Sequence, residues 1–324
     1  MASKFPSEAE VVIVGVGGIV GSMIAYWLTE LGQKNIVGLE KSSVIPSDMG
    51  STAHASDFVY NTTHDKLGNW STAFSRNFYD DNGFFLKKGG LEICRKDDDV
   101  LWEELKRKVS SGKAFGTNVR LISAAEAKEK FPLLDEDSIR GAMWDPDAGL
   151  VTPRSQDVVR FAVEHAKEKG ALKTYADTPA TGFEIENGRI TAVKTERGTI
   201  KTDKVVIASG IWGPLVGEMA GVSVPLMPVE HPLLFFGPLP EAQGAEDFLV
   251  YPLMRDQGNS AYVRDTGKLH GGMLEWGFYE DKEPRLVDAE DIGNPDKTMM
   301  SDSMRYLDLE EVAEPLAKAF ETTP

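Results

Sequence analysis

The clearest pattern of apolar and polar positions lies at the front of the chain. Residues 11–14 form a continuous apolar run, which predicts a strand buried on both faces of a parallel sheet. A helical stretch over 22–31 follows and is closed by Gly32, where a left-handed residue is favoured. A second apolar run covers 36–39 and ends in Glu40. This order predicts a strand–helix–strand unit of a parallel sheet.

Helical periodicity and capping signals recur further along the chain. They predict four helices. The first covers 97–108, and the second is short, opened by the capping box of Ser123 and Glu126 and ended by Pro132. The third runs from Pro153, at its first position, to about Lys169, and the fourth covers 307–320 with an interruption at Pro315.

Strand signals dominate two later stretches. Alternation around Asn187-Gly188 and Arg197-Gly198 predicts antiparallel strands between 181 and 207. The apolar run at 205–207 is expected to return beside the first strand of the chain. Five prolines over 222–240 fit edge strands and turns. A second, antiparallel sheet is then predicted from strands at 248–251, 261–264 and 269–274.

A cluster of glycines separates the first strand from the first helix: Gly15, Gly17, Gly18 and Gly21. Glycines here let the backbone turn tightly and approach a pyrophosphate, to which the helix N-terminus offers amides and partial positive charge. Glu40 stands where an acid accepts hydrogen bonds from ribose hydroxyls. The loop is one residue longer than the usual G-x-G-x-x-G fingerprint. The cluster predicts dinucleotide binding, with a plain strand-to-helix turn as the alternative.

Composition narrows the range of partners. The formal net charge of −16 argues against nucleic acid or an anionic membrane as a partner, because acid repels phosphate. Cys94 is the only cysteine, so we expect no internal disulfide, and we expect no metal site. No secretory signal and no apolar run of membrane-spanning length is evident, so the expected location is the cytoplasm.

Several motifs carry a resemblance to a known family. In chain order they lie at residues 50–55, 89–93, 131–134, 188–193, 205–213 and 224–231. Together with the opening strand–helix–strand unit they resemble the flavoprotein half of dimethylglycine oxidases and of the related dimethylglycine and sarcosine dehydrogenases, within the D-amino-acid-oxidase-like superfamily. The motifs run in family order across nearly the whole chain.

The resemblance implies an FAD-dependent enzyme that oxidises a small N-methylated amino acid by hydride transfer to the flavin. It implies a mixed α/β fold, in which a Rossmann-like FAD-binding βαβ sheet is interleaved with an antiparallel-sheet substrate domain. The expected boundaries are 1–80 and 150–222 for the FAD-binding domain and 81–149 and 223–324 for the substrate domain. The expected cofactor contacts are Gly15, Gly17, Gly18, Gly21, Glu40, Lys41, Ser51, Thr52, His54, Ala208, Gly210 and Trp212, the last of which could instead be core packing.

Two further residues match the catalytic positions of the resembling family. His231 matches its histidine on the strand facing the flavin, and Tyr262 matches the partner tyrosine. Such a pair can relay the amine proton and hold the substrate, and a purely structural hydrogen-bonded pair is the alternative. Arg255 or Arg264 could bind a substrate carboxylate, although each could equally be a surface residue. Tyr251 is a further pocket candidate, Cys94 is expected to be inert, and His165 is expected to be structural.

His54 raises the possibility of a covalent cofactor. In some members of the resembling family, the histidine at this position is attached to the flavin. Ala53 precedes it here, where the attached members often have tryptophan. Covalent attachment, a noncovalent cofactor contact and an ordinary loop histidine therefore stay open as alternatives.

The chain stops at Pro324, before the glycine-rich segment that closes over the flavin in the family and before its folate-binding half. We therefore expect a fragment, a truncated form or one subunit of a larger assembly, with a folate-binding or second subunit as a possible partner. An inactive binding module and a nicotinamide-dependent dehydrogenase are the competing interpretations.

Overall fold

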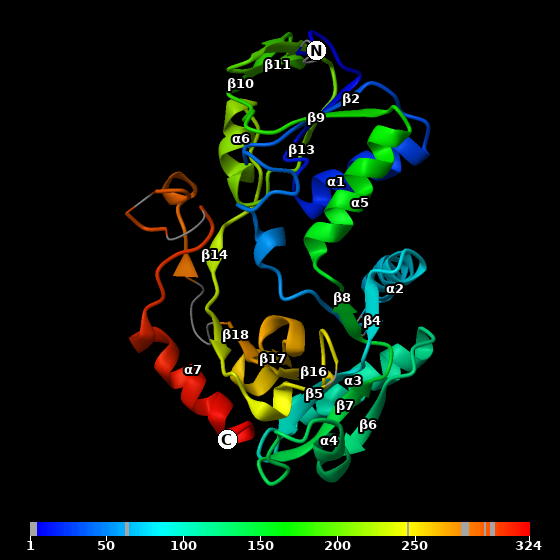
Figure 1. The fold of residues 1–324 in the computed structure, drawn as a ribbon, viewed down its shortest axis with the longest axis vertical. Helices are drawn as coiled ribbons and strands as arrows, with labels where there is room; N and C mark the ends of the chain where they lie inside the picture. The colour runs from blue at the N-terminus through cyan, green and yellow to red at the C-terminus, as the bar shows by residue number, and fades with distance from the viewer. Residues whose placement is uncertain (1–4, 62–64, 245, 280–284, 295, 299–301) are drawn as a thin grey trace. The chain divides into compact units, whose positions relative to one another are not determined.

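The computed structural model describes residues 5–61, 65–244, 246–279, 285–294, 296–298 and 302–324 (Figure 1). The chain divides into two compact units. The first unit comprises 1–56, 154–229 and 286–306, and the second comprises 57–153, 230–285 and 307–324. Each unit is therefore assembled from three separate stretches of the chain.

A four-stranded parallel sheet forms the centre of the first unit. Its strands are β1 (Val11–Val14), β2 (Ile36–Leu39), β9 (Leu172–Tyr175) and β13 (Val205–Ile207), in the order β13-β1-β2-β9. All residues of β1 and β2 are buried, as their continuous apolar runs predict. The predicted return of 205–207 beside the first strand is confirmed, because Ile13 of β1 pairs with Val206.

Two helices of the first unit pack together against this sheet. Helix α1 (Ile19–Glu30) lies beside α5 (Ser155–Glu168), and Ala25 and Val159 enter the same buried cluster as Ile13 (Figure 1). The prediction of α1 was wrong at its start, since the helix begins at Ile19 rather than at 22. Helix α1 therefore begins inside the glycine cluster.

A three-stranded antiparallel sheet completes the regular structure of the first unit, as the turn dipeptides predict. Its strands are β10 (Gly182–Glu186), β11 (Arg189–Thr195) and β12 (Gly198–Lys201). The short elements are η1 (Ser51–His54), η2 (Gly210–Trp212), α6 (Gly213–Met219) and η6 (Ala289–Asp291). The strands β14 (Val229–Glu230) and β19 (Arg285–Leu286) pair with each other. The boundary between the two units passes through both strands, between their two residues.

The second unit is built on a seven-stranded sheet in the order β15-β18-β17-β16-β5-β7-β6. These strands are β5 (Gly90–Arg95), β6 (Arg120–Ser123), β7 (Ile139–Asp145), β15 (Leu233–Phe236), β16 (Leu253–Asp256), β17 (Ala261–Asp265) and β18 (Leu274–Phe278). A smaller sheet joins β3 (Phe58–Val59), β8 (Gly149–Val151) and β4 (Phe85–Lys87). The remaining elements are α2 (Lys66–Asp81), α3 (Asp99–Ala114), α4 (Ala124–Lys130), α7 (Leu309–Thr322), η3 (Pro240–Ala242), η4 (Gln257–Asn259) and η5 (Lys268–His270).

The two faces of the large sheet have different surroundings. On one face, Leu91, Met254 and Trp276 form the core with apolar residues of α4 and α7. The opposite face is covered by α3 at the β5–β7–β6 end, where Leu105 packs on Met143. The β16–β17–β18 part of this opposite face carries the residues on which the candidate site depends.

Three sequence predictions in the second unit need correction. No strand forms at 248–251, because the amides of Val250 and Tyr251 bond to the Asp265 carboxylate, each at 2.8 Å, and the strand forms instead as β16. The strand expected at 269–274 begins only at Leu274, because η5 and the left-handed Gly271 come first. Pro315 lies inside a continuous α7 and does not interrupt it.

The helix predicted from Pro153 begins two residues later, at Ser155, with Arg154 as its extended N-terminal cap residue. Half of the predicted capping box is confirmed, since the Ser123 hydroxyl accepts a hydrogen bond from the Glu126 amide, whereas the Glu126 carboxylate pairs with Arg120. No helix among the residues that the structure describes is long and apolar enough to cross a membrane.

The mixed α/β class is confirmed, with a parallel Rossmann-like sheet and separate antiparallel sheets. The assignment of a cofactor domain to 1–80 and 150–222, and of a substrate domain to the rest, stays a prediction.

Candidate functional site

Three chain segments of the first unit meet at the carboxyl edge of the parallel sheet. Gly15 follows β1, Glu40 follows β2 and Ala208 follows β13. A side chain at Gly15 would place its Cβ 2.5 Å from the Ala208 carbonyl oxygen, so the two turns are in direct backbone contact. In open parallel sheets, ligands bind outside the carboxyl ends of the strands.

The glycines of the cluster differ in how strictly they are required. Gly15 has a φ of +95°, a conformation that favours glycine. A Cβ at Gly21 would lie 2.1 Å from the Gly15 carbonyl oxygen, and one at Gly17 would lie 2.5 Å from the Glu40 carboxylate. At Gly18 the nearest atom would be 3.6 Å away, an ordinary contact. The sterically required pattern is therefore G-x-G-x-x-x-G, and Gly18 is the extra glycine that makes the loop look irregular.

Glu40 is buried and holds the glycine loop. One carboxylate oxygen accepts the Gly17 amide at 2.8 Å, and the other accepts the Ser42 amide at 3.0 Å. A carboxylate offers about four lone-pair sites, so both oxygens can accept further hydrogen bonds, such as those from ribose hydroxyls.

The Ser-Thr-Ala-His motif forms η1 beside the start of α1. The Thr52 hydroxyl accepts the Ile19 amide at 3.1 Å and so binds this motif to the helix N-terminus. Ser51 is exposed, and His54 is half-buried at the end of η1. Burial, followed by the positive charge of Arg154, lowers the pKa of His54, whereas Asp48 acts in the opposite direction. Arg154 donates to the Ala53 and Ala55 carbonyls at 3.2 and 3.0 Å.

The remaining predicted cofactor residues lie in the same unit. The Lys41 ammonium lies 4.7 Å from the centre of the Trp212 ring and forms an ion pair with Asp302. Trp212 is half-buried, and Gly210 is exposed with a φ of +54°. The buried Ser209 hydroxyl, between Ala208 and Gly210, has no hydrogen-bond partner among the described residues.

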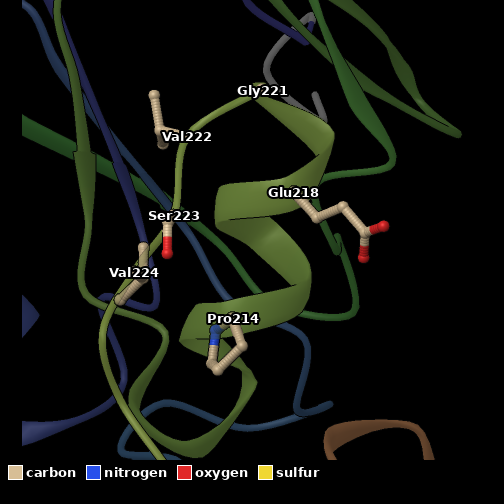
Figure 2. A pocket seen from close by; sticks show the side chains of 6 residues that line it. All are labelled: Pro214, Glu218, Gly221, Val222, Ser223 and Val224. Carbon is tan, nitrogen blue, oxygen red and sulfur yellow. The ribbon is translucent and has the colours of Figure 1, made fainter.

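A separate open groove runs along α6, with a volume of about 340 Å³. Figure 2 shows Pro214 and Glu218 on the helix and Val222, Ser223 and Val224 on the segment beside it, with the Glu218 side chain directed away from that segment. Glu218 is its one charged side chain and is exposed. The groove contains none of the predicted site residues, and we assign no chemistry to it.

The substrate-side residues lie on the open face of the large sheet in the second unit. Tyr262 of β17 pairs in register with Arg255 of β16 and with Gly277 of β18. A Cβ at Gly277 would lie 2.0 Å from the Tyr262 ring, so this glycine provides the space in which the ring lies. The Arg255 guanidinium lies 4.1 Å from the centre of the Tyr60 ring.

The two candidate arginines have opposite environments. Arg264 is buried and forms an ion pair with the equally buried Glu275, which leaves it unavailable to a substrate. Arg255 is half-buried and has no ion pair or hydrogen bond with any residue that the structure describes. Of the two, Arg255 is the one whose charge is available to an anionic ligand.

Tyr279 connects the two predicted catalytic residues. Its ring centre lies 4.7 Å from that of His231 and 5.7 Å from that of Tyr262. Phe58 packs edge-on against the other side of the Tyr262 ring, with centres 5.2 Å apart. Sequence reasoning missed Tyr279 and Phe58. Tyr279 follows β18 directly and could have been noticed as an aromatic residue at a strand end, but the register that brings it to His231 is not visible in the sequence.

The other candidates lie elsewhere. Tyr251 packs on Phe131 in the core of the opposite face, and its hydroxyl donates to the Glu241 carbonyl at 2.8 Å. Cys94 is buried, and burial raises its pKa to about 11, which fits an inert thiol. His165 bonds to Glu30 at 2.7 Å between α5 and α1, a structural contact. A further histidine, His64, lies outside the described residues.

The carboxyl edge fits the FAD that the sequence predicts. Gly15, Gly17 and Gly21 have no space for a Cβ, so no side chain covers the backbone there. Glu40, the acid expected to bind the ribose, lies beside them. The buried Ser209 hydroxyl at the same edge has no hydrogen-bond partner among the described residues, and a ligand bound there would supply one.

Comparison with known proteins agrees with this geometry. The family described as DAO, FAD dependent oxidoreductase, matches residues 10–317. Human mitochondrial sarcosine dehydrogenase is 30% identical over 288 residues, which cover 85% of this chain and 29% of that protein. Human mitochondrial dimethylglycine dehydrogenase is 28% identical over 329 residues, covering 99% of this chain and 36% of that protein. The chain thus spans about a third of the length of these relatives.

Among solved structures, L-proline dehydrogenase from P. horikoshii superposes with a TM-score of 0.78 and 28% sequence identity. The match covers 97% of this chain and 77% of that protein.

Proposed function

The chain belongs to the DAO family of FAD-dependent oxidoreductases, and within that family we propose that it oxidises the C–N bond of a small N-methylated amino acid such as dimethylglycine or sarcosine. The names of the similar sarcosine and dimethylglycine dehydrogenases support this substrate class. The observation that carries the proposal is the half-buried Arg255, which lies directly across from Tyr262 and has no ion pair with any residue that the structure describes. The family membership favours FAD over the nicotinamide alternative.

The cofactor is proposed to be held by the residues predicted from the sequence. FAD, when bound, supplies the acceptor for the hydride that leaves the carbon beside the amine nitrogen. The bare backbone at Gly15, Gly17, Gly18 and Gly21 would approach the pyrophosphate, while Glu40 would accept the ribose hydroxyls. The other proposed contacts are Lys41, Ser51, Thr52, His54, Ala208, Gly210 and Trp212.

The substrate would be bound by charge and by aromatic rings. A guanidinium can hold a carboxylate with two parallel hydrogen bonds, and Arg255 is placed for this role on the face that also carries Tyr262. An imidazole such as that of His231 has a ring nitrogen that can accept a proton, and the Tyr262 hydroxyl can donate or accept a hydrogen bond. We propose that these two residues hold the amine and take up its proton.

We also propose that His54 forms the covalent link to the flavin: an imidazole nitrogen would bond to the flavin 8α carbon in place of one of its hydrogens, and the flavin itself would take up the two electrons that this step releases. Its half-buried position in η1, with a pKa lowered first by burial, supports a neutral imidazole. Acid precipitation of the purified chain tests this. Flavin colour retained in the pellet of the wild type but not of His54→Gln supports the link, and colour lost from both contradicts it.

The function is tested by steady-state turnover with an artificial electron acceptor. Sarcosine and dimethylglycine should be oxidised, and N-methylated amines of the same size that lack a carboxylate should not, because they leave Arg255 unpaired. Equal rates with and without the carboxylate would contradict the proposal, as would turnover with reduced nicotinamide instead.

Partners are proposed from the length of the relatives. Because this chain spans about a third of the sarcosine and dimethylglycine dehydrogenases, a folate-binding part or a second subunit is the partner we propose. Sarcosine oxidase subunit beta from Arthrobacter sp, 29% identical over 69% of this chain, supports the subunit alternative. The cytoplasmic location stays a prediction.

A further inference from the structure

We propose that Arg154 is a positioning residue for His54, which it serves by holding the loop on both sides of that histidine. The proposal rests on the function proposed above, in which His54 meets the flavin. The Arg154 guanidinium donates to the carbonyl of Ala53, immediately before His54, at 3.2 Å. It also donates to the carbonyl of Ala55, immediately after His54, at 3.0 Å. One side chain thus fixes the backbone on either side of the imidazole.

The position of Arg154 in the fold explains why it can do this. It is the cap residue of α5 and has an extended backbone, with φ −154° and ψ 158°. Cap residues usually accept hydrogen bonds from the helix amides, but this side chain makes no such bond and is directed to the loop instead. Gln156, two residues further along, donates from its amide to the Ser47 carbonyl at 3.2 Å. The start of α5 therefore holds the loop 47–55 at two places.

The charged groups around His54 also support a role of Arg154 in preparing this histidine. Arg154 from α5 and Asp48 from the loop itself are the charged groups that act on the imidazole. Burial and then Arg154 lower the pKa of His54, whereas Asp48 raises it, and the overall direction is downward. The Asp48 carboxylate accepts a hydrogen bond from the Ser42 hydroxyl at 2.6 Å. The imidazole is therefore kept neutral at neutral pH, which is the form that can act as a nucleophile or hydrogen-bond acceptor.

The test uses the flavin-free full chain with ¹³C-labelled histidine. NMR titrations are recorded for the wild type, Arg154→Gln and Arg154→Lys, and the His54 signal is assigned by its loss in His54→Gln. Removing the charge and loosening the loop both raise the pKa of His54, so we expect an upward shift in R154Q. We expect a smaller upward shift in R154K, because lysine keeps the charge but lacks the rigid, planar guanidinium, one nitrogen of which donates to both carbonyls.

Hydrogen exchange of the 47–56 backbone measures the positioning itself. Both Arg154 variants should exchange faster there than the wild type. The matched control is Arg160→Gln, which removes an arginine of the same helix whose partner is the nearby Asp157 and which should change neither readout. Unchanged exchange at 47–56 together with an unchanged His54 titration in R154Q would overturn the proposal.

These readouts separate the inference from the proposed function. If the wild type retains no flavin after acid precipitation, the covalent link fails, yet the exchange and titration of the flavin-free chain still decide the role of Arg154. If the link exists and Arg154 positions His54, R154Q loses most of the acid-stable flavin while R160Q keeps it.

Discussion

Each of the two candidate regions is stabilised internally, and the kind of contact differs between them. At the carboxyl edge of the parallel sheet, the contacts are made by the backbone: Gly15 touches the Ala208 carbonyl, and the Gly17 amide bonds to Glu40. On the open face of the seven-stranded sheet, the contacts are made by side chains: the Tyr279 ring contacts both the His231 ring and the Tyr262 ring. The first region is therefore fixed by turns that exclude side chains, and the second by the register of strands.

This difference determines what a substitution can do in each region. Adding one methyl group at Gly15 or Gly21 brings a Cβ against backbone atoms, so the fold and the cofactor site are disturbed together. On the open sheet face, a side chain can be exchanged while the strands beneath it stay paired. Arg255 and Arg264 differ in the same way within one sheet. Arg255 is half-buried and has no ion pair with a described residue, whereas Arg264 is buried in an ion pair with Glu275.

The largest expected effect is on the buried arginine. Arg264→Met leaves the Glu275 carboxylate buried without its ion-pair partner, which costs roughly 3–5 kcal/mol of unfolding free energy. Urea denaturation measures this loss. A loss below about 1 kcal/mol would show that Arg264 is not the structural arginine of the pair.

The next effect concerns the glycine loop. Gly21→Ala places a Cβ 2.1 Å from the Gly15 carbonyl oxygen and should lower the unfolding free energy by roughly 1–3 kcal/mol, because the backbone must move. Gly18→Ala is the matched control and should cost less, about 0.5–1 kcal/mol, because the nearest atom is 3.6 Å away and only the preference for glycine at the N-cap of α1 is lost. Equal losses in the two variants would contradict the proposed G-x-G-x-x-x-G pattern.

Arg255→Met should change activity far more than stability. Loss of a charge-assisted pair with the substrate carboxylate is worth roughly 1.5–3 kcal/mol, so KM should rise about 10- to 100-fold. The unfolding free energy should fall by only about 1 kcal/mol, from the lost contact with Tyr60. An unchanged KM in a folded variant would remove Arg255 from the proposed substrate site.

The smallest effect is on the pH dependence of stability. The pKa of His54 is lower in the folded chain than in the unfolded chain, so the unfolded chain binds the proton more readily. Stability should therefore fall as pH drops through the unfolded value of about 6.5, with no such loss above it. Urea denaturation of flavin-free wild type and His54→Gln from about pH 8 to about pH 5 measures this, and the variant should lack that part of the slope.

The sequence predicts the carboxyl edge better than the open sheet face, for a physical reason. The edge depends on local features: an apolar run, glycines without room for Cβ and an acid at a strand end. The confirmed bounds of β1 and β2 follow from these features alone. The start of α1 was missed because Gly18 and Gly21 weaken helix propensity, although tertiary contacts place Gly21 inside the helix.

The open sheet face depends on long-range pairing. The strand at 253–256 was missed because its neighbours at 250–251 have the stronger apolar pattern but give their amides to Asp265. Arg255 and Arg264 lie on the same face of the sheet, because Arg255 pairs with Tyr262 in register and Arg264 is two residues further along the same strand. The residue opposite each arginine distinguishes them: Arg264 lies opposite Glu275 and pairs with it, whereas Arg255 lies opposite Glu92, whose ion pair is with Lys108.

Binding of FAD to the flavin-free chain tests the central claim most directly. Wild type, Gly17→Ala and Gly18→Ala are titrated with FAD, and binding is measured by the quenching of flavin fluorescence. Gly17→Ala disturbs the contact between the glycine loop and Glu40, whereas Gly18→Ala leaves it intact. We predict that the wild type and G18A bind FAD and that G17A binds it much more weakly, because its Cβ would lie 2.5 Å from the Glu40 carboxylate. Equal binding by G17A and the wild type, or no binding by the wild type, would contradict the account.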